Sequence, residues 1–182
     1  TPHQKLLVLD VPDEHVEHVV STLKENGLDA RPSPFRRSTI ACTGIEYCKL
    51  AIVDTKDTAT ATIDELEQRL GDLSQMKPLS LHVNGCPNSC ARIQTADIGL
   101  KGQLVMDDDG QQVPGFQVHL GGGLASDDRE VAGMGRTVRG LKVTADDLTD
   151  YVERVVRRYE SDKDGSETFA EWAHRADEEA LR

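Results

Sequence analysis

The chain has 182 residues, with 32 acidic and 21 basic side chains and a formal net charge of −11. This length fits one domain with its own core, and the negative excess argues against nucleic acid as a partner, because phosphate binding needs clustered positive charge. No apolar run reaches the ~18 residues of a membrane span, and the first residues lack the features of a signal peptide. We therefore expect a cytoplasmic protein without a membrane segment.

The first part of the chain is predicted to form a strand followed by a helix. The apolar run KLLVLDV, residues 5–11, has strand length, and residues 12–27 place apolar side chains at helical spacing before Gly27 ends the pattern. Residues 31–38, RPSPFRRS, contain two prolines and three arginines. That composition indicates an extended loop or linker.

The middle of the chain alternates between helical and strand-like patterns. Residues 44–56 and 60–73 both have the apolar spacing of helices. The acidic sequence DDDG at 107–110 has the Asp-Gly chemistry of a tight turn and predicts a hairpin around it. Three segments have the length and composition of strands: 79–85, 96–105 and 114–122.

The carboxyl-terminal part is predicted to be helical. Residues 144–160 carry an apolar stripe, with Thr144 and Asp147 as a capping pair at the start. Residues 165–182 indicate a last short helix and a frayed tail. Helices and strands interleave along the chain, which predicts the α/β (α+β) class, with helices flanking a mixed sheet.

Four cysteines form two local pairs. Disulfides are disfavoured in the cytoplasm, so two local pairs indicate a metal centre. Structural zinc usually takes pairs two to four residues apart, and the first pair is separated by five. A 4Fe-4S cluster has four iron corners and tolerates this spacing. Structural zinc and four reduced core cysteines are the alternatives. The cysteines are Cys42, Cys48, Cys86 and Cys90.

The second pair is predicted to lie at the start of a helix. Pro87 suits a first helical turn, which would place Cys86 at the cap and Cys90 one turn later. The positive end of a helix favours thiolates and sulfide. Gly85 would let the backbone approach a bulky inorganic group.

The two cysteine segments resemble the signature of the ferredoxin-dependent nitrite and sulfite reductases. The segments are CTGIEYCKLAIVDTK at 42–56 and NGCPNSCARIQTADIGLKG at 84–102. In that family the two pairs hold a 4Fe-4S cluster coupled to sirohaem. The resemblance implies that Cys42, Cys48, Cys86 and Cys90 ligate the cluster, and that the sulfur of Cys90 also bridges to the sirohaem iron.

The resemblance also suggests polar residues that serve the cofactors, although it identifies no catalytic residue. Two of them flank the bridging cysteine and would contact sulfur or the carboxylate rim of the haem, with a helix-cap amide and a solvated arginine as the alternative roles. These are Asn88 and Arg92. Three more basic residues would serve the same rim or lie on the plain surface: Arg36, Arg37 and Lys49.

The resemblance further implies a domain division and a reaction. Residues 1–35 would be a ferredoxin-like half-repeat and residues 36–182 the sirohaem and 4Fe-4S domain. Together they would form the carboxyl-terminal half of an enzyme whose missing amino-terminal half supplies most basic groups around the substrate. Ferredoxin would donate electrons, and the substrate would be a small anion.

Within this resemblance, the CTG and DTK flanks are more similar to the nitrite reductases and so imply reduction of nitrite to ammonia, although Asp54 stands where those proteins more often have Glu. Reduction of sulfite to sulfide by the same cofactors is the alternative. A haem-free iron–sulfur electron-transfer module and a zinc-stapled interaction domain are alternatives from other classes.

Residues 160–171 also resemble a calcium loop, but Glu160 stands where Asp is expected and Glu167 where an apolar residue is expected. A solvated connection between two helices is therefore the favoured interpretation.

Overall fold

The fold is built on one five-stranded mixed sheet. The computed structural model describes residues 1, 3–71, 76–125 and 132–182. The first three strands in the sheet are parallel, and the last two pairs are antiparallel. This confirms the α/β class with a mixed sheet, and three of the strands match the segments predicted from the sequence. In spatial order the strands are β1 (Thr39–Ala41), β2 (Leu81–Asn84), β3 (Ile98–Met106), β4 (Gln112–Leu120) and β5 (Lys142–Thr144).

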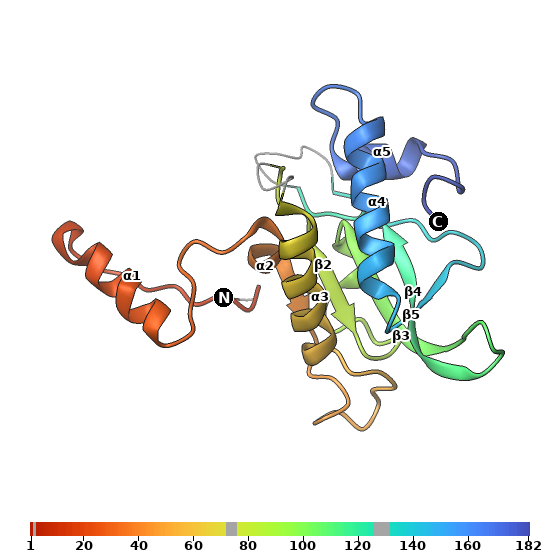
Figure 1. Ribbon diagram of the computed structural model, residues 1–182, viewed down its shortest axis with the longest axis horizontal. Coiled ribbons are helices and arrows are strands. Elements are labelled where there is room, and N and C mark those ends of the chain that lie inside the picture. Colours follow the sequence, from red (N-terminus) through yellow and green to blue (C-terminus); the bar gives the residue numbers. More distant parts are fainter. Residues whose placement is uncertain (2, 72–75, 126–131) are drawn as a thin grey trace.

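Two long helices, α3 and α4, cover one face of this sheet (Figure 1). The predicted turn between β3 and β4 is present, because the Gly110 N–H donates to the Asp107 carbonyl at 3.1 Å. None of the described helices is both long and apolar enough to cross a membrane. The α-helices are α1 (Val16–Glu25), α2 (Pro34–Ser38), α3 (Lys56–Arg69), α4 (Leu148–Asp162) and α5 (Phe169–Arg175).

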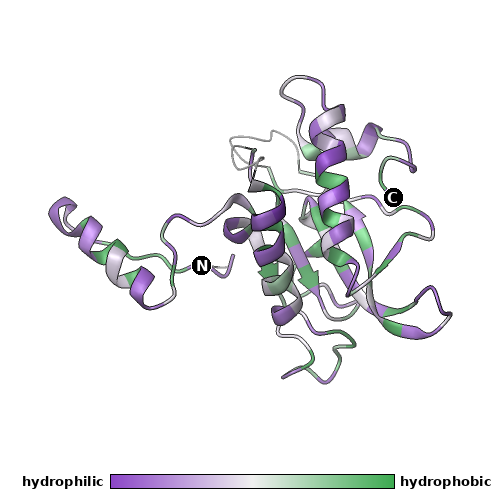
Figure 2. Ribbon diagram, in the orientation of Figure 1, coloured by the Kyte–Doolittle hydropathy of each residue, from purple (hydrophilic) through white to green (hydrophobic). Residues whose placement is uncertain are grey.

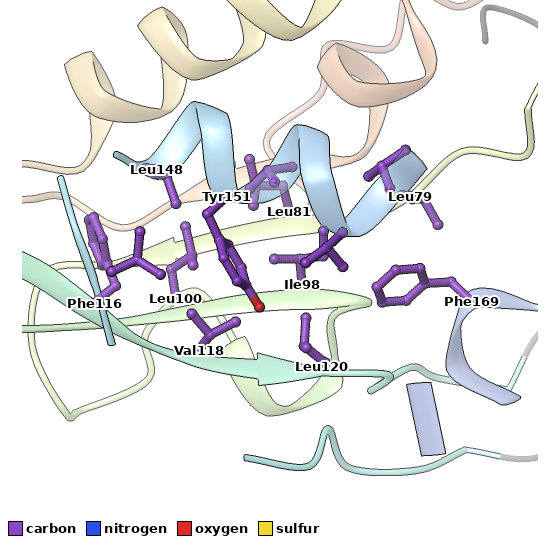
Figure 3. Packing of buried hydrophobic residues seen from close by; sticks show 14 of the residues in the cluster. Leu79, Leu81, Ile98, Leu100, Phe116, Val118, Leu120, Leu148, Tyr151 and Phe169 are labelled. Carbon is purple, nitrogen blue, oxygen red and sulfur yellow. The ribbon is translucent and has the colours of Figure 1, made fainter. Parts of the chain in front are cut away.

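The main core lies between the sheet and these two helices. Figure 3 shows Leu148 and Tyr151 of α4 over Leu100 and Val118 of the sheet. Side chains buried this completely contribute about 1.5–3 kcal/mol each. The predicted apolar stripe of 144–160 is therefore confirmed. The Thr144 hydroxyl accepts from the Asp147 N–H at 3.0 Å, but Thr144 belongs to β5, and α4 begins at Leu148 without a side-chain cap. The predicted capping pair is therefore wrong, and this contact belongs to the turn between β5 and α4.

The carboxyl-terminal segment is more ordered than predicted. Helix α5 begins with a reciprocal capping box between Thr168 and Glu171. The frayed tail was a wrong prediction, because Leu181 is fully buried and its carbonyl accepts from the Tyr151 hydroxyl at 3.0 Å. The last residues therefore belong to the core.

The amino-terminal arm, residues 3–31, starts beside the sheet and then projects away from it (Figure 1). Helix α1 is present as predicted, but none of its residues is buried. The predicted strand at 5–11 is absent: in the described part of the chain no strand lies beside these residues, and Leu6 is 70% exposed. An apolar run forms a strand only where a neighbour satisfies its backbone groups. Figure 2 shows that the arm carries apolar residues away from the core.

The arm is tied to the sheet at the edge strand β1. The Gln4 carboxamide donates to the Ala41 carbonyl at 2.7 Å and accepts from the Ala41 N–H at 3.0 Å. One side chain thus satisfies both backbone groups of Ala41 at the edge of the sheet. The predicted linker at 31–38 instead contains the short helix α2, because Ser33 caps the Arg36 N–H and Phe35 is buried.

The predicted helix at 44–56 is wrong over most of its length. Residues 45–50 form turns, and α3 begins only at Lys56. The Ile52 and Val53 N–H groups both donate to the carbonyl of Gly85, far along the chain, at 2.7 and 3.3 Å. Long-range pairing therefore overrides the local helical pattern in this segment.

Candidate functional site

The two cysteine pairs come together because they follow neighbouring parallel strands. Cys42 comes directly after β1, and its N–H donates to the Val83 carbonyl of β2 at 2.9 Å. Cys86 lies two residues beyond the end of β2. The carboxyl ends of parallel strands meet at one edge of a sheet, which brings together two segments that are distant in sequence.

Gly85 joins the two cysteine loops through its backbone. Its N–H donates to Cys42 Sγ at 3.2 Å, and its carbonyl accepts from Ile52 and Val53 in the loop that contains Cys48. A Cβ at this position would lie 2.8 Å from the Val53 carbonyl oxygen. Glycine is therefore required here by close contact between the two loops, and its predicted approach to an inorganic group stays a prediction.

Thr55 closes the first cysteine loop on itself. This fully buried side chain donates from Oγ1 to the Cys42 carbonyl at 2.8 Å. Gly44 has φ of +80°, and a Cβ there would lie 2.6 Å from Thr55 Oγ1. The sequence analysis missed Thr55, whose only signal is its place immediately before α3.

The second cysteine pair does not lie on a helix, which corrects the prediction made from Pro87. Residues 87 and 88 form a turn, and Ser89 and Arg92 have left-handed backbones with φ of 59° and 56°. A left-handed residue interrupts a right-handed helix. The helix-dipole argument for thiolates therefore fails here, and an N–H directed at sulfur, from Gly85 to Cys42, is the electrostatic feature that the structure offers instead.

The four thiols differ in exposure. Cys42 and Cys48 are half-buried, Cys86 is buried and Cys90 is exposed, and none is in a disulfide. Among the residues that the structure describes, no three Cys, His, Asp or Glu side chains converge closely enough to hold a single metal ion. Four thiols on two loops joined by backbone contacts match the number of cysteine ligands that a 4Fe-4S cluster takes from a protein.

The polar residues singled out near the cysteines lie in different surroundings. Arg36 pairs with Glu67 at 2.7 Å and with Asp64 at 2.5 Å, both on α3, and this pairing lowers the pKa of the Glu67 carboxyl. Asn88 and Lys49 are exposed. The charge of Arg36 is thus engaged in fastening α2 to α3.

Arg37 and Arg92 line one cavity of about 430 Å³. His82 also lines it, and burial lowers the pKa of this imidazole, which keeps it neutral at pH 7. The Arg92 guanidinium lies 3.4 Å from His3 Nδ1. The structure therefore brings two of the five polar candidates together.

The calcium-like segment uses its carboxylates for ion pairs. Glu160 pairs with Lys163 at 2.6 Å, and Arg175 with Glu167 at 2.5 Å. Glu171 caps α5. These contacts agree with the favoured interpretation of a connection between α4 and α5.

The fold and the site together define a class, namely a mixed α/β domain that presents four thiols beyond the ends of two parallel strands. A family model described as the nitrite and sulphite reductase 4Fe-4S domain matches residues 33–182. The chain belongs to this family, and the resemblance noted in its two cysteine segments is confirmed.

Individual relatives agree with this assignment. The chain is 53% identical over its whole length to sulfite reductase (ferredoxin) 1 of Mycolicibacterium paratuberculosis, of which it covers 32%. It is 36% identical to the ferredoxin–nitrite reductase of Synechococcus elongatus over 70% of this chain and 24% of that protein. The solved structure of the Mycobacterium tuberculosis NirA protein superimposes with a TM-score of 0.94 at 49% identity, over all of this chain and 33% of that one. The chain thus spans about a third of the length of such relatives.

Proposed function

We propose that this chain is the carboxyl-terminal, cofactor-binding part of a ferredoxin-dependent sulfite reductase. Relatives named sulfite reductase are 50–53% identical over the whole chain, whereas those named ferredoxin–nitrite reductase are 36% identical over 70% of it. This difference in identity favours sulfite as the substrate. The CTG and DTK flanks had instead suggested nitrite. Nitrite is the second candidate.

The proposed cluster ligands are Cys42, Cys48, Cys86 and Cys90, with Cys90 as the bridge to sirohaem. The observation that carries the proposal is that the backbone of Gly85 connects the two cysteine loops. Its N–H donates to Cys42 Sγ, and its carbonyl, next to Cys86 in the sequence, accepts from the loop that contains Cys48. We also propose residues 1–35 as a ferredoxin-like half-repeat and 36–182 as the cofactor domain.

The reaction would convert one sulfite into one sulfide, SO₃²⁻ + 6e⁻ + 7H⁺ → HS⁻ + 3H₂O. When bound, the cluster and sirohaem would pass on the electrons received from ferredoxin and provide the site where sulfur is reduced. The residues of this chain would hold the four sulfurs at fixed positions. They would keep Cys86 away from water and leave Cys90 accessible to the second cofactor.

The remaining parts of the active site would come from outside this chain. Stabilising an oxyanion and delivering protons require positive and acidic groups near the substrate. We propose that the amino-terminal part present in the longer relatives supplies most of them, and that ferredoxin supplies single electrons.

The test is product analysis on a protein that carries this chain together with the amino-terminal part of its relatives, purified without oxygen. Reduced ferredoxin is supplied with either sulfite or nitrite, and sulfide and ammonia are measured. We expect a higher kcat/KM for sulfite. A higher value for nitrite would establish the second candidate, iron and sulfide without haem absorption would indicate the haem-free module, and zinc without iron would refute the cluster.

A further inference from the structure

Two polar side chains on β2 are buried against the loop that carries Cys86 and Cys90. Side chains alternate between faces along a strand, and Leu81 and Val83 belong to the main core. His82 and Asn84 alternate with them and so lie on the other face of the sheet, where they are 6% and 0% exposed. Buried polar groups at the end of a strand need partners.

Their partners are backbone groups of that loop. Asn84 Nδ2 donates to the Cys86 carbonyl at 2.9 Å, and Asn84 Oδ1 accepts from the Ala91 N–H at 2.7 Å. His82 Nδ1 lies 3.2 Å from the Arg92 carbonyl oxygen. The Asn84 carboxamide thus spans the loop from Cys86 to the residue that follows Cys90.

This loop lacks the internal bonds of a helix and contains strained residues. Ser89 and Arg92 have left-handed backbones, a conformation that ordinary residues keep only where their surroundings impose it. The Arg92 N–H donates to the Ser89 carbonyl at 2.8 Å, which fixes one turn. The Ser89 hydroxyl also donates to Gln94 Oε1 in the following turn. The contacts of Asn84 and His82 link the loop to β2.

We propose that Asn84 is a positioning residue for the cluster, setting the distance between Cys86 and Cys90 through its two hydrogen bonds to the loop. The proposal rests on the proposed function. A carboxamide suits the role because it donates and accepts through one short, rigid group. Aspartate keeps the acceptor for Ala91 but loses the donor to Cys86 and brings a buried negative charge.

The experiment uses the same longer protein, with Asn26→Ala as the matched control, because Asn26 is an exposed asparagine at the end of α1, away from the cysteine loops. Iron and sulfide content, the rate of iron loss to a chelator, the midpoint potential and the EPR spectrum of the reduced cluster are measured. Asn84→Ala is expected to lose iron about tenfold faster than the control. Asn84→Asp is expected to lower the midpoint potential, because a nearby negative charge disfavours the reduced cluster.

Circular dichroism establishes that each variant is folded. If aspartate unfolds the protein, Asn84→Ser, which is uncharged and smaller, is judged by the EPR spectrum and chelator rate instead. A folded variant that assembles no cluster supports the proposal, as does a changed potential or EPR spectrum. Potentials and EPR spectra equal to those of Asn26→Ala would overturn it. A parent protein without iron would instead refute the proposed function, so the two failures are distinguishable.

Discussion

Replacing Gly85 by alanine is the sharpest test of how the two cysteine loops are joined. The added methyl would lie 2.8 Å from the Val53 carbonyl oxygen, 3.1 Å from Ala51 Cβ and 3.2 Å from Thr55 Cγ2. Unstrained contacts between such atoms are about 3.5–4.0 Å. The nearest obstacle is backbone, so relief requires the loop that follows Cys48 to move away.

The cost has two parts. Forcing one methyl into a filled site costs about 1–3 kcal/mol. Moving the loop also lengthens the hydrogen bonds from Ile52 and Val53 to the Gly85 carbonyl, at about 1 kcal/mol for a bond that is lost. We therefore expect Gly85→Ala to destabilise the fold by about 2–4 kcal/mol, and to lower iron content because the two cysteine pairs separate.

The assay is urea unfolding under anaerobic conditions, followed by circular dichroism, together with iron and sulfide analysis. Gly71→Ala is the matched control, because a Cβ there would meet nothing within 4 Å. If Gly85→Ala equals this control in both stability and iron content, contact between the loops does not determine the site.

Three further predictions concern the ligands, an ion pair and the extent of the active site. Cys86→Ser is expected to remove most iron and sulfide, measured on protein purified without oxygen. Glu67→Gln is expected to cost at most about 1 kcal/mol at pH 7, because the Arg36 pair is partly exposed. Arg36 lowers the pKa of Glu67 below its ordinary value of 4.5, so this contribution should vanish as the pH falls through the lowered pKa, which urea titrations at pH 7 and pH 3 would detect. The isolated chain, supplied with both cofactors, is expected to release no sulfide or ammonia above a Cys90→Ser blank, because the groups that stabilise the anion are proposed to lie elsewhere.

The elements predicted correctly are those whose signals are local. Helix α4 has the predicted apolar stripe, and its spacing is set within a few residues. The turn at 107–110 has its own backbone chemistry. The cysteine spacing identified the family because the pattern extends over both loops.

The wrong predictions share a different cause, because distant partners decide them. Residues 45–53 have helical spacing, yet two of their N–H groups bond to Gly85. Residues 5–11 have a strand pattern without a neighbouring strand in the described chain. Pro87 suits a helix start, but Ser89 is left-handed and Ala91 bonds to Asn84. The sequence analysis also missed that the polar residues His82 and Asn84 alternate with apolar residues in a strand that is buried on both faces.

The chain does not fix its four thiols to the same degree, and this difference agrees with two cofactors meeting at one of them. Cys42 continues the ladder of β1 and receives an N–H at its sulfur, so backbone groups fix both its main chain and its thiol. Cys48 lies in a turn, with its N–H bonded to the Gly44 carbonyl at 3.0 Å. Cys90 is exposed. It follows the left-handed residue Ser89 and precedes Ala91, whose N–H donates to Asn84 Oδ1. The proposed bridging sulfur would need a fixed backbone and an open far side, and Cys90 alone of the four thiols is exposed while its loop is hydrogen-bonded to β2.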